Sequence, residues 1–220
     1  LPTLSKNTTP LVFMTILIKY LNNNHNISVV SLRDREVHSI FNIPGVRVIL
    51  LGEKSFYDKL KYLNKLNYDI ILSSLFQADV LASVLSGSCK KISMVRADIL
   101  MNYIYDKGKI TGPLMYFIHA ISLSQFDSIF ALTYHNAKRL IFCKKNKIKI
   151  IRNFINEPSV KNTILNNDQV LRLLSVGHLS SRKGIFDLVE IVGGLLSENF
   201  NIKLTILGEG PLEQKIRNYI

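Results

Sequence analysis

Short apolar runs alternate along the chain with longer segments of helical period. The runs are rich in Val, Ile and Leu, and apolar and polar positions do not alternate cleanly within them. Such runs are typical of strands covered on both faces, as in a parallel sheet. The predicted strands lie at 27–32, 46–51, 69–73, 91–95, 128–132 and 148–151.

Segments with a period near 3.6 residues separate these strands and predict helices. They lie at 10–21, 56–66, 74–85, 112–126 and 134–142. Alternating strands and helices imply right-handed crossovers between parallel strands. We therefore expect an α/β protein with a doubly wound, Rossmann-like sheet.

A second unit follows a stretch without clear periodicity. Strands are predicted at 171–176, which reads as buried, and at 202–207, and helices at 184–196 and 211–219. Two strands and two helices are too few for an independent doubly wound domain. We expect an N-terminal domain at 1–153, a linker at 154–170 and a partial second domain at 171–220.

The charge is spread unevenly over 220 residues with a net charge of +12. Residues 1–165 hold 22 basic and 10 acidic side chains, whereas 166–220 hold six of each. This asymmetry indicates that the first part faces an anionic partner. A bias in the base composition of the gene is the alternative source of the charge, because Lys, Asn and Ile number 19, 19 and 27.

Several function classes lack support in the sequence. Cys89 and Cys143 are too few for a disulfide framework and have no metal-ligand spacing, so we expect core thiols in a reducing compartment. We see no signal peptide and no apolar run of about 20 residues. Residue 1 is Leu, so we expect the chain to begin inside a longer protein.

The loop GHLSSRKG at 177–184, between a predicted strand and a predicted helix, carries the strongest candidate chemistry. Ligands of open α/β sheets bind at the carboxyl ends of strands. Gly177 permits close backbone approach, and Arg182 and Lys183 offer positive charge to phosphate oxygens. Gly184 opens the helix, whose N-terminal N–H groups favour an anion. The loop predicts a diphosphate site that needs no metal.

The next strand ends in a similar turn, LGEGP at 207–211. Gly208 and Gly210 indicate a tight turn, and Pro211 indicates the start of a helix. The third glycine of a dinucleotide fingerprint is absent. Either turn alone has an ordinary structural interpretation, but two in succession, with a basic pair in the first, favour a ligand site. His178 either contacts the ligand or lies on the surface.

Residues 171–220 resemble the start of the C-terminal domain of the retaining, GT-B-fold glycosyltransferases known as glycosyl transferases group 1 (family 4). The family pattern VG-x-L-x-x-x-KG matches 176–184, and its GEGP motif matches 208–211. Asn153 stands where the family has an asparagine at its domain junction. Residues 1–147 resemble the acceptor-binding N-terminal domain more weakly.

The resemblance implies retaining transfer of a sugar from a nucleotide-diphosphate donor to an acceptor. It assigns Arg182 and Lys183 to the catalytic neutralisation of the leaving diphosphate. The nucleotide sugar is a substrate, and neither a cofactor nor a metal is expected. The donor-binding residues that it implies are Gly177, His178, Gly184, Gly208, Glu209, Gly210 and Pro211.

The first part of the chain departs from the family pattern. No strand precedes the first loop, and this loop, KNTTP at 6–10, has no glycine; Thr8 and Thr9 are acceptor-side candidates there. The family often has a histidine where this chain has Arg96, which either faces the acceptor or pairs with Asp98. For Asp98 we prefer a structural role. The paired-glutamate motif is missing, so we expect truncation at both ends.

The leading hypothesis is a cytoplasmic glycosyltransferase, peripheral on the inner face of the membrane, that acts on a lipid-linked glycan in polysaccharide or lipopolysaccharide biosynthesis. The basic cluster at 144–149 is either a solvated turn or a contact with an anionic bilayer. The alternative is a non-catalytic remnant or an anion- or nucleic-acid-binding module. Nucleic acid is not expected, because no helix-turn-helix, stacking motif or zinc site is visible.

Two expectations concern the histidines and the stability of the chain. His25, His38, His119 and His135 show no common spacing, so we expect surface or core positions for them. A donor domain that stops after its second helix leaves sheet edge and apolar surface uncovered. We therefore expect low stability and little turnover from these residues alone.

Overall fold

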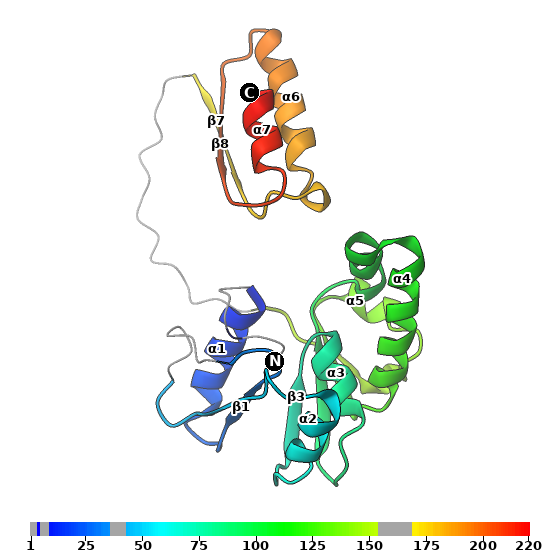
Figure 1. The fold of residues 1–220 in the computed structure, drawn as a ribbon. Helices are drawn as coiled ribbons and strands as arrows, with labels where there is room; N and C mark the ends of the chain where they lie inside the picture. The colour runs from blue at the N-terminus through cyan, green and yellow to red at the C-terminus, as the bar shows by residue number, and fades with distance from the viewer. Residues whose placement is uncertain (1–3, 5–8, 36–42, 154–168) are drawn as a thin grey trace. The chain divides into compact units, whose positions relative to one another are not determined.

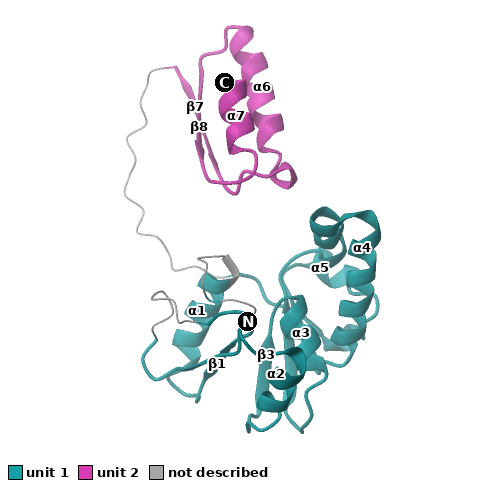
Figure 2. Ribbon diagram, viewed as in Figure 1, with its two compact units in different colours: residues 1–157 teal, residues 158–220 magenta. Residues whose placement is uncertain are grey.

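The computed structural model describes residues 4, 9–35, 43–153 and 169–220, without the side chains of Thr9 and Pro10 (Figure 1). The chain divides into two compact units, residues 1–157 and residues 158–220 (Figure 2). In the described part of the chain, no helix is both long enough and apolar enough to cross a membrane.

The strands of unit 1 form two parallel sheets. One sheet pairs β1 (Ser28–Ser31) with β2 (Arg47–Leu50), and the other has the order β3 (Ile70–Ser73), β4 (Lys90–Val95), β5 (Ser128–Ala131) and β6 (Ile148–Ile150). The parallel arrangement was predicted, but the single sheet was not found in the described residues. One apolar cluster, which includes Leu4, Phe13 and Met94, packs against strands of both sheets.

The described residues of unit 1 form five α-helices: α1 (Thr9–Leu21), α2 (Phe56–Leu63), α3 (Phe76–Ser83), α4 (Ile99–Ser124) and α5 (Tyr134–Arg139). Helix α1 precedes β1, and each of the other four lies between two successive strands. Side-chain caps fix several of their starts, because a cap oxygen accepts an N–H that the helix itself leaves unpaired. Ser55 caps α2, Asp98 caps α4 and Thr133 caps α5.

Helix α4 is broken at Gly108, whose φ of 87° lies in the left-handed region that suits glycine. Tyr103 Oη and His119 Nδ1 nevertheless lie 2.8 Å apart. In a straight helix, residues sixteen apart are about 24 Å from one another, so the chain must fold back at the break. A Cβ on Gly112 would lie 2.7 Å from the backbone of Tyr103 and Ile104. The two parts of α4 therefore pack closely against each other.

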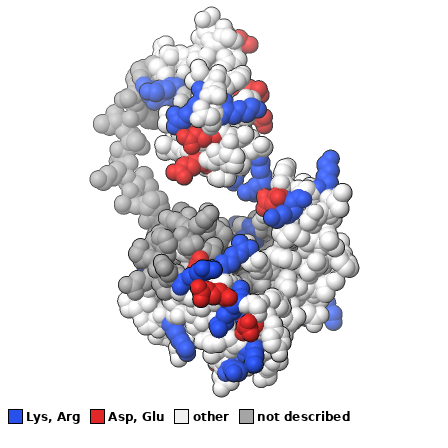
Figure 3. Space-filling model, in the orientation of Figure 1, with Lys and Arg blue, Asp and Glu red and all other residues white. Residues whose placement is uncertain are grey.

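Much of the surface over α4 carries no charged side chains (Figure 3). The sequence has no Lys, Arg, Asp or Glu between Lys109 and Asp127. In Figure 3 the flank of unit 1 that α4 covers is largely white, with blue side chains toward its ends.

Unit 2 consists of the parallel strands β7 (Leu171–Val176) and β8 (Ile202–Leu207) and the helices α6 (Ile185–Ser197) and α7 (Glu213–Tyr219). Both helices lie on the same side of the strands (Figure 1). Leu204 and Ile206 of β8 pack against the helical core, whereas Leu174 and Val176 of β7 are exposed. The prediction of a buried strand at 171–176 was wrong, because only one face of this two-stranded sheet is covered within the unit.

Candidate functional site

The two loops that were expected to bind a ligand lie side by side at the carboxyl ends of β7 and β8. Gly177 N–H donates to the Leu207 carbonyl at 3.0 Å, which extends the strand pairing into the loops. Leu179 N–H donates to the Glu209 carbonyl at 2.8 Å, and the Leu179 carbonyl accepts from Leu212 N–H at 3.0 Å. The loops therefore form one double turn at the strand edge where α/β sheets bind ligands.

Close approach between the loops explains why glycine occupies positions 208 and 210. A Cβ on Gly208 would lie 1.8 Å from the Gly177 carbonyl oxygen, and one on Gly210 would lie 2.4 Å from the Leu179 carbonyl oxygen. Side chains at 208 and 210 are therefore excluded by the backbone of the other loop. Beside Gly177, by contrast, a Cβ would meet nothing within 4 Å, which leaves open space for a ligand.

The basic pair lies in a short 3₁₀ turn, η3 (Ser181–Lys183), directly before α6. Arg182 and Lys183 are both exposed. Gly184 adopts φ 66° and ψ 20° as the N-cap of α6 and supplies no side-chain cap. The first-turn N–H groups of the helix therefore depend on other acceptors, as an anion would provide. Asp187 in the same turn adds a negative charge.

The other residues that were expected to bind the donor also lie on this double turn. His178 and Glu209 are exposed in the two loops. Pro211 precedes α7, which begins at Glu213 and not at the proline. The predicted start was wrong by two residues, because Leu212 serves as the N-cap and its N–H is bonded to the other loop.

A shallow pocket of about 190 Å³ opens beside the start of α6. It is lined by Ser181, Gly184, Phe186, Asp187, Leu212 and Lys215. Lys215 Nζ lies 3.9 Å from the centre of the Phe186 ring, a cation–π contact. Sequence reasoning missed Lys215, since only the fold brings α7 to this turn.

Arg96, which the sequence made an acceptor-side candidate, directly follows β4. Its Nη2 donates to Asn153 Oδ1 at 2.7 Å, and its guanidinium lies 4.3 Å from the centre of the Phe13 ring. Burial lowers the pKa of Arg96. Its Nη1 is buried and has no hydrogen-bond partner among the described residues. Of the other candidates, Thr8 lies outside the described residues and Thr9 begins α1.

Asp98 does not need Arg96 as a partner. Its carboxylate accepts from Met101 N–H at 3.2 Å, and it pairs with Arg139 Nε at 2.8 Å. Burial raises the pKa of Asp98, but the bonds from Met101 and Arg139 outweigh this effect and hold it below its usual value. Asp98 therefore caps α4 and ties α5 to it.

A second pocket, of about 370 Å³, lies where β5 and β6 end. It is lined by Leu132, Thr133, Tyr134, Ile150, Arg152 and Asn153. Asn153 links this pocket to Arg96 through the hydrogen bond described above. Of these residues, the sequence had singled out only Asn153. Arg152 could have been included from the sequence, because it directly follows the strand predicted at 148–151.

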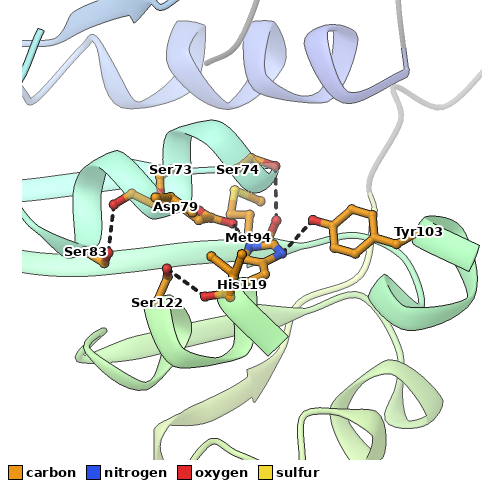
Figure 4. Close-up of polar contacts among 10 residues, drawn as sticks. Ser73, Ser74, Asp79, Ser83, Met94, Tyr103, His119 and Ser122 are labelled. Carbon is orange, nitrogen blue, oxygen red and sulfur yellow. Dashed lines mark hydrogen bonds and ion pairs between the residues drawn. The ribbon is translucent and has the colours of Figure 1, made fainter. Parts of the chain in front are cut away.

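A buried polar chain crosses the core between α3 and α4 (Figure 4). Ser73 Oγ donates to Asp79 Oδ1 at 2.5 Å, Asp79 Oδ2 lies 2.8 Å from His119 Nε2, and His119 Nδ1 lies 2.8 Å from Tyr103 Oη. Asp79 and His119 are 1% and 3% exposed. Burial, helped by the Asp79 charge, raises the pKa of Tyr103.

The buried polar chain differs from a nucleophilic triad. Ser73 is buried, and its hydroxyl donates to the carboxylate of Asp79 instead of the imidazole of His119. We therefore assign the polar chain a structural role, which agrees with the predicted core or surface position of His119. Among the described residues, no three His, Cys, Asp or Glu side chains gather as a metal site would require.

No protein-family model matches the chain, and no curated protein matches its sequence. Solved structures do match. One is the apo form of the lipopolysaccharide outer core galactosyltransferase WaaB, with a TM-score of 0.69 and 14% identity over 99% of this chain. Another is HepE of Anabaena in complex with UDP and glucose, with a TM-score of 0.69 and 12% identity over 98% of this chain.

The chain spans 62% of the length of each of these two proteins. At such low identity the likeness concerns the fold. The protein has a partial GT-B fold, with two Rossmann-like units of parallel strands.

Proposed function

We propose that the protein is a retaining glycosyltransferase that moves a sugar from a nucleotide-diphosphate sugar to a glycan acceptor. The observation that carries this proposal is the double turn of unit 2. It combines a helix N-terminus without a side-chain cap, two exposed basic residues and open space beside Gly177. These groups are suited to bind a diphosphate.

Arg182 and Lys183 have the chemistry that such a reaction needs from the donor side. As the bond between the sugar and the diphosphate breaks, negative charge grows on the leaving phosphate oxygens. Fixed positive charge at that position stabilises the transition state more than the ground state. HepE, which shares the fold, was solved with UDP and glucose, and this supports a nucleotide sugar as the donor.

The acceptor is assigned to unit 1. The pocket of about 370 Å³ at the ends of β5 and β6 is suited in size to a sugar unit. The buried Nη1 of Arg96 offers an additional donor close to Asn153. We propose a lipid-linked glycan acceptor at the cytoplasmic face of a membrane, in polysaccharide or lipopolysaccharide assembly. The name of WaaB supports this acceptor class.

Titration of UDP and other nucleoside diphosphates into the chain, followed by calorimetry, tests the donor site. Arg182→Ala and Lys183→Ala each remove a charge-assisted contact worth about 1.5–3 kcal/mol, so affinity should fall roughly 10- to 100-fold. Lys203→Ala on β8 removes an exposed basic residue outside the turn and serves as the control. Equal affinities for all four proteins would refute the assignment of the diphosphate site.

Sugar transfer is then measured with the longest reading frame that contains these residues. The same two substitutions should lower kcat, because the charges act on the leaving group. Diphosphate binding without any transfer would instead indicate a non-catalytic anion-binding protein.

A further inference from the structure

An apolar stripe faces solvent along the second part of α4. Ile110, Leu114, Phe117 and Ile121 are 89%, 60%, 51% and 52% exposed. Their spacing of four, three and four residues places them on one face of the helix. On the opposite face the helix is anchored by buried residues, which are Gly112, His119, Ala120, Ser122 and Leu123.

The stripe continues onto a neighbouring segment. The ring of Phe142 meets the ring of Phe117 edge to face, with centroids 6.2 Å apart. Phe142 and its neighbour Ile141 are both exposed. A single exposed apolar side chain is ordinary, but a contiguous patch on the part of α4 after Lys109, which has no charged residue, marks an interaction surface.

Basic residues border this stripe. Lys107 and Lys109 precede its first residue, and Lys144 and Lys145 follow Phe142; all four are exposed. The two border segments, 105–109 and 141–147, contain five lysines and one acidic residue, Asp106. An apolar helix face with a lysine border has the pattern of a helix that lies in the interface of a negatively charged bilayer.

We propose that this α4 face, defined by the stripe from Ile110 to Ile121 together with Ile141 and Phe142, binds an anionic lipid surface. The apolar side chains enter the boundary between headgroups and acyl chains, and the lysines contact the lipid phosphates. A second copy is a poorer occupant, because an isologous contact would bring the lysine borders of both copies together. Lipid binding does not depend on the proposed sugar transfer.

A single tryptophan provides a direct test, because the natural sequence contains none. Phe117→Trp places the reporter in the α4 face and keeps it aromatic. Tyr57→Trp on α2, at another exposed position of unit 1, is the control. With phosphatidylcholine vesicles that contain about one third phosphatidylglycerol, we expect the emission of Trp at 117 to shift to the blue and brominated acyl chains to quench it. Trp at 57 should respond to neither.

Vesicle sedimentation measures how strongly each variant binds to the lipid surface. The pair Leu114→Gln and Ile121→Gln should weaken binding at least about tenfold, because apolar area no longer leaves water. Ile191→Gln on α6 changes a side chain of the same 60% exposure as Leu114 and should have no effect. Lys107→Gln and Lys109→Gln should each weaken binding about fivefold, and vesicles of phosphatidylcholine alone should bind much less. Circular dichroism verifies that each variant is folded.

Several outcomes would overturn the proposal. One is vesicle binding that survives the double glutamine variant but is lost when Lys144 and Lys145 are replaced, since binding would then be purely electrostatic. Another is a blue shift at position 117 without lipid that depends on protein concentration, which would indicate a second copy. A third is the absence of any response at 117. Titration of UDP into the same variants should be unaffected, so failure here is distinct from failure of the donor-site proposal.

Discussion

Substitution of Gly208 by alanine tests whether the double turn is a single packed structure. The added Cβ would lie 1.8 Å from the Gly177 carbonyl oxygen, whereas ordinary van der Waals contact begins at 3.4 Å. The two loops must therefore separate by roughly 1.6 Å, because the obstacle is backbone and cannot rotate away. Such a shift breaks the 3.0 Å bond from Gly177 N–H to the Leu207 carbonyl.

The free energy that Gly208→Ala takes from the stability of unit 2 has two components. Each backbone hydrogen bond lost between the loops contributes about 0.5–1.5 kcal/mol, and two are at risk, at Gly177 and at Leu179. Overpacking adds about 1–3 kcal/mol. We expect the free energy of opening of unit 2 to fall by about 3 kcal/mol, which corresponds to amide exchange roughly 100-fold faster.

Hydrogen exchange followed by mass spectrometry resolves peptides from β7 and β8 and so isolates unit 2 from unit 1. Gly193→Ala in α6 is the matched control, because a Cβ there would meet nothing within 4 Å. This change should stabilise the helix by up to about 1 kcal/mol, since alanine is the better helix former. If amides of β7 and β8 exchanged as slowly in Gly208→Ala as in the wild type, the close approach of the two loops would be refuted.

Two further predictions concern unit 1. The lowered pKa of Asp98 means that its stabilising contribution is complete above the unfolded carboxyl pKa of about 3.9 and is lost as the pH falls through the lower folded value. Urea midpoints of wild type and Asp98→Asn should therefore differ at about pH 7 and converge toward about pH 3; parallel curves would contradict this. Asp79→Ala leaves the buried side chains of Ser73 and His119 without their acceptor, so it should destabilise the protein by about 3–5 kcal/mol in urea unfolding, whereas Asp106→Ala at an exposed position should cost little. A loss below about 1 kcal/mol at Asp79 would rule out a buried polar chain.

Local signals predicted the elements of unit 2 closely. The strands at 171–176 and 202–207 coincide with β7 and β8, because a glycine ends each apolar run. In unit 1 the predicted helix at 112–126 missed the first half of α4. Glycine and proline are poor helix formers, and the backbone does break at Gly108, but the chain on both sides of this break is helical.

The candidate site was predictable only in part. The glycines at 208 and 210 indicated a tight turn, but the need for them comes from the loop of the preceding strand, which no local pattern reveals. Asp79 and His119 lie 40 positions apart in sequence, so their pairing depends on how α3 packs against α4. The exposed stripe on α4 was missed because its period is that of a buried helix face.

The tie between the loops also has a consequence for protein engineering. Leu179 uses both its N–H and its carbonyl to bind the other loop, through Glu209 and Leu212. A loop that depends on its neighbour in this way cannot be grafted alone. An exchange of 177–184 with the corresponding loop of another protein should therefore include 208–212 as well.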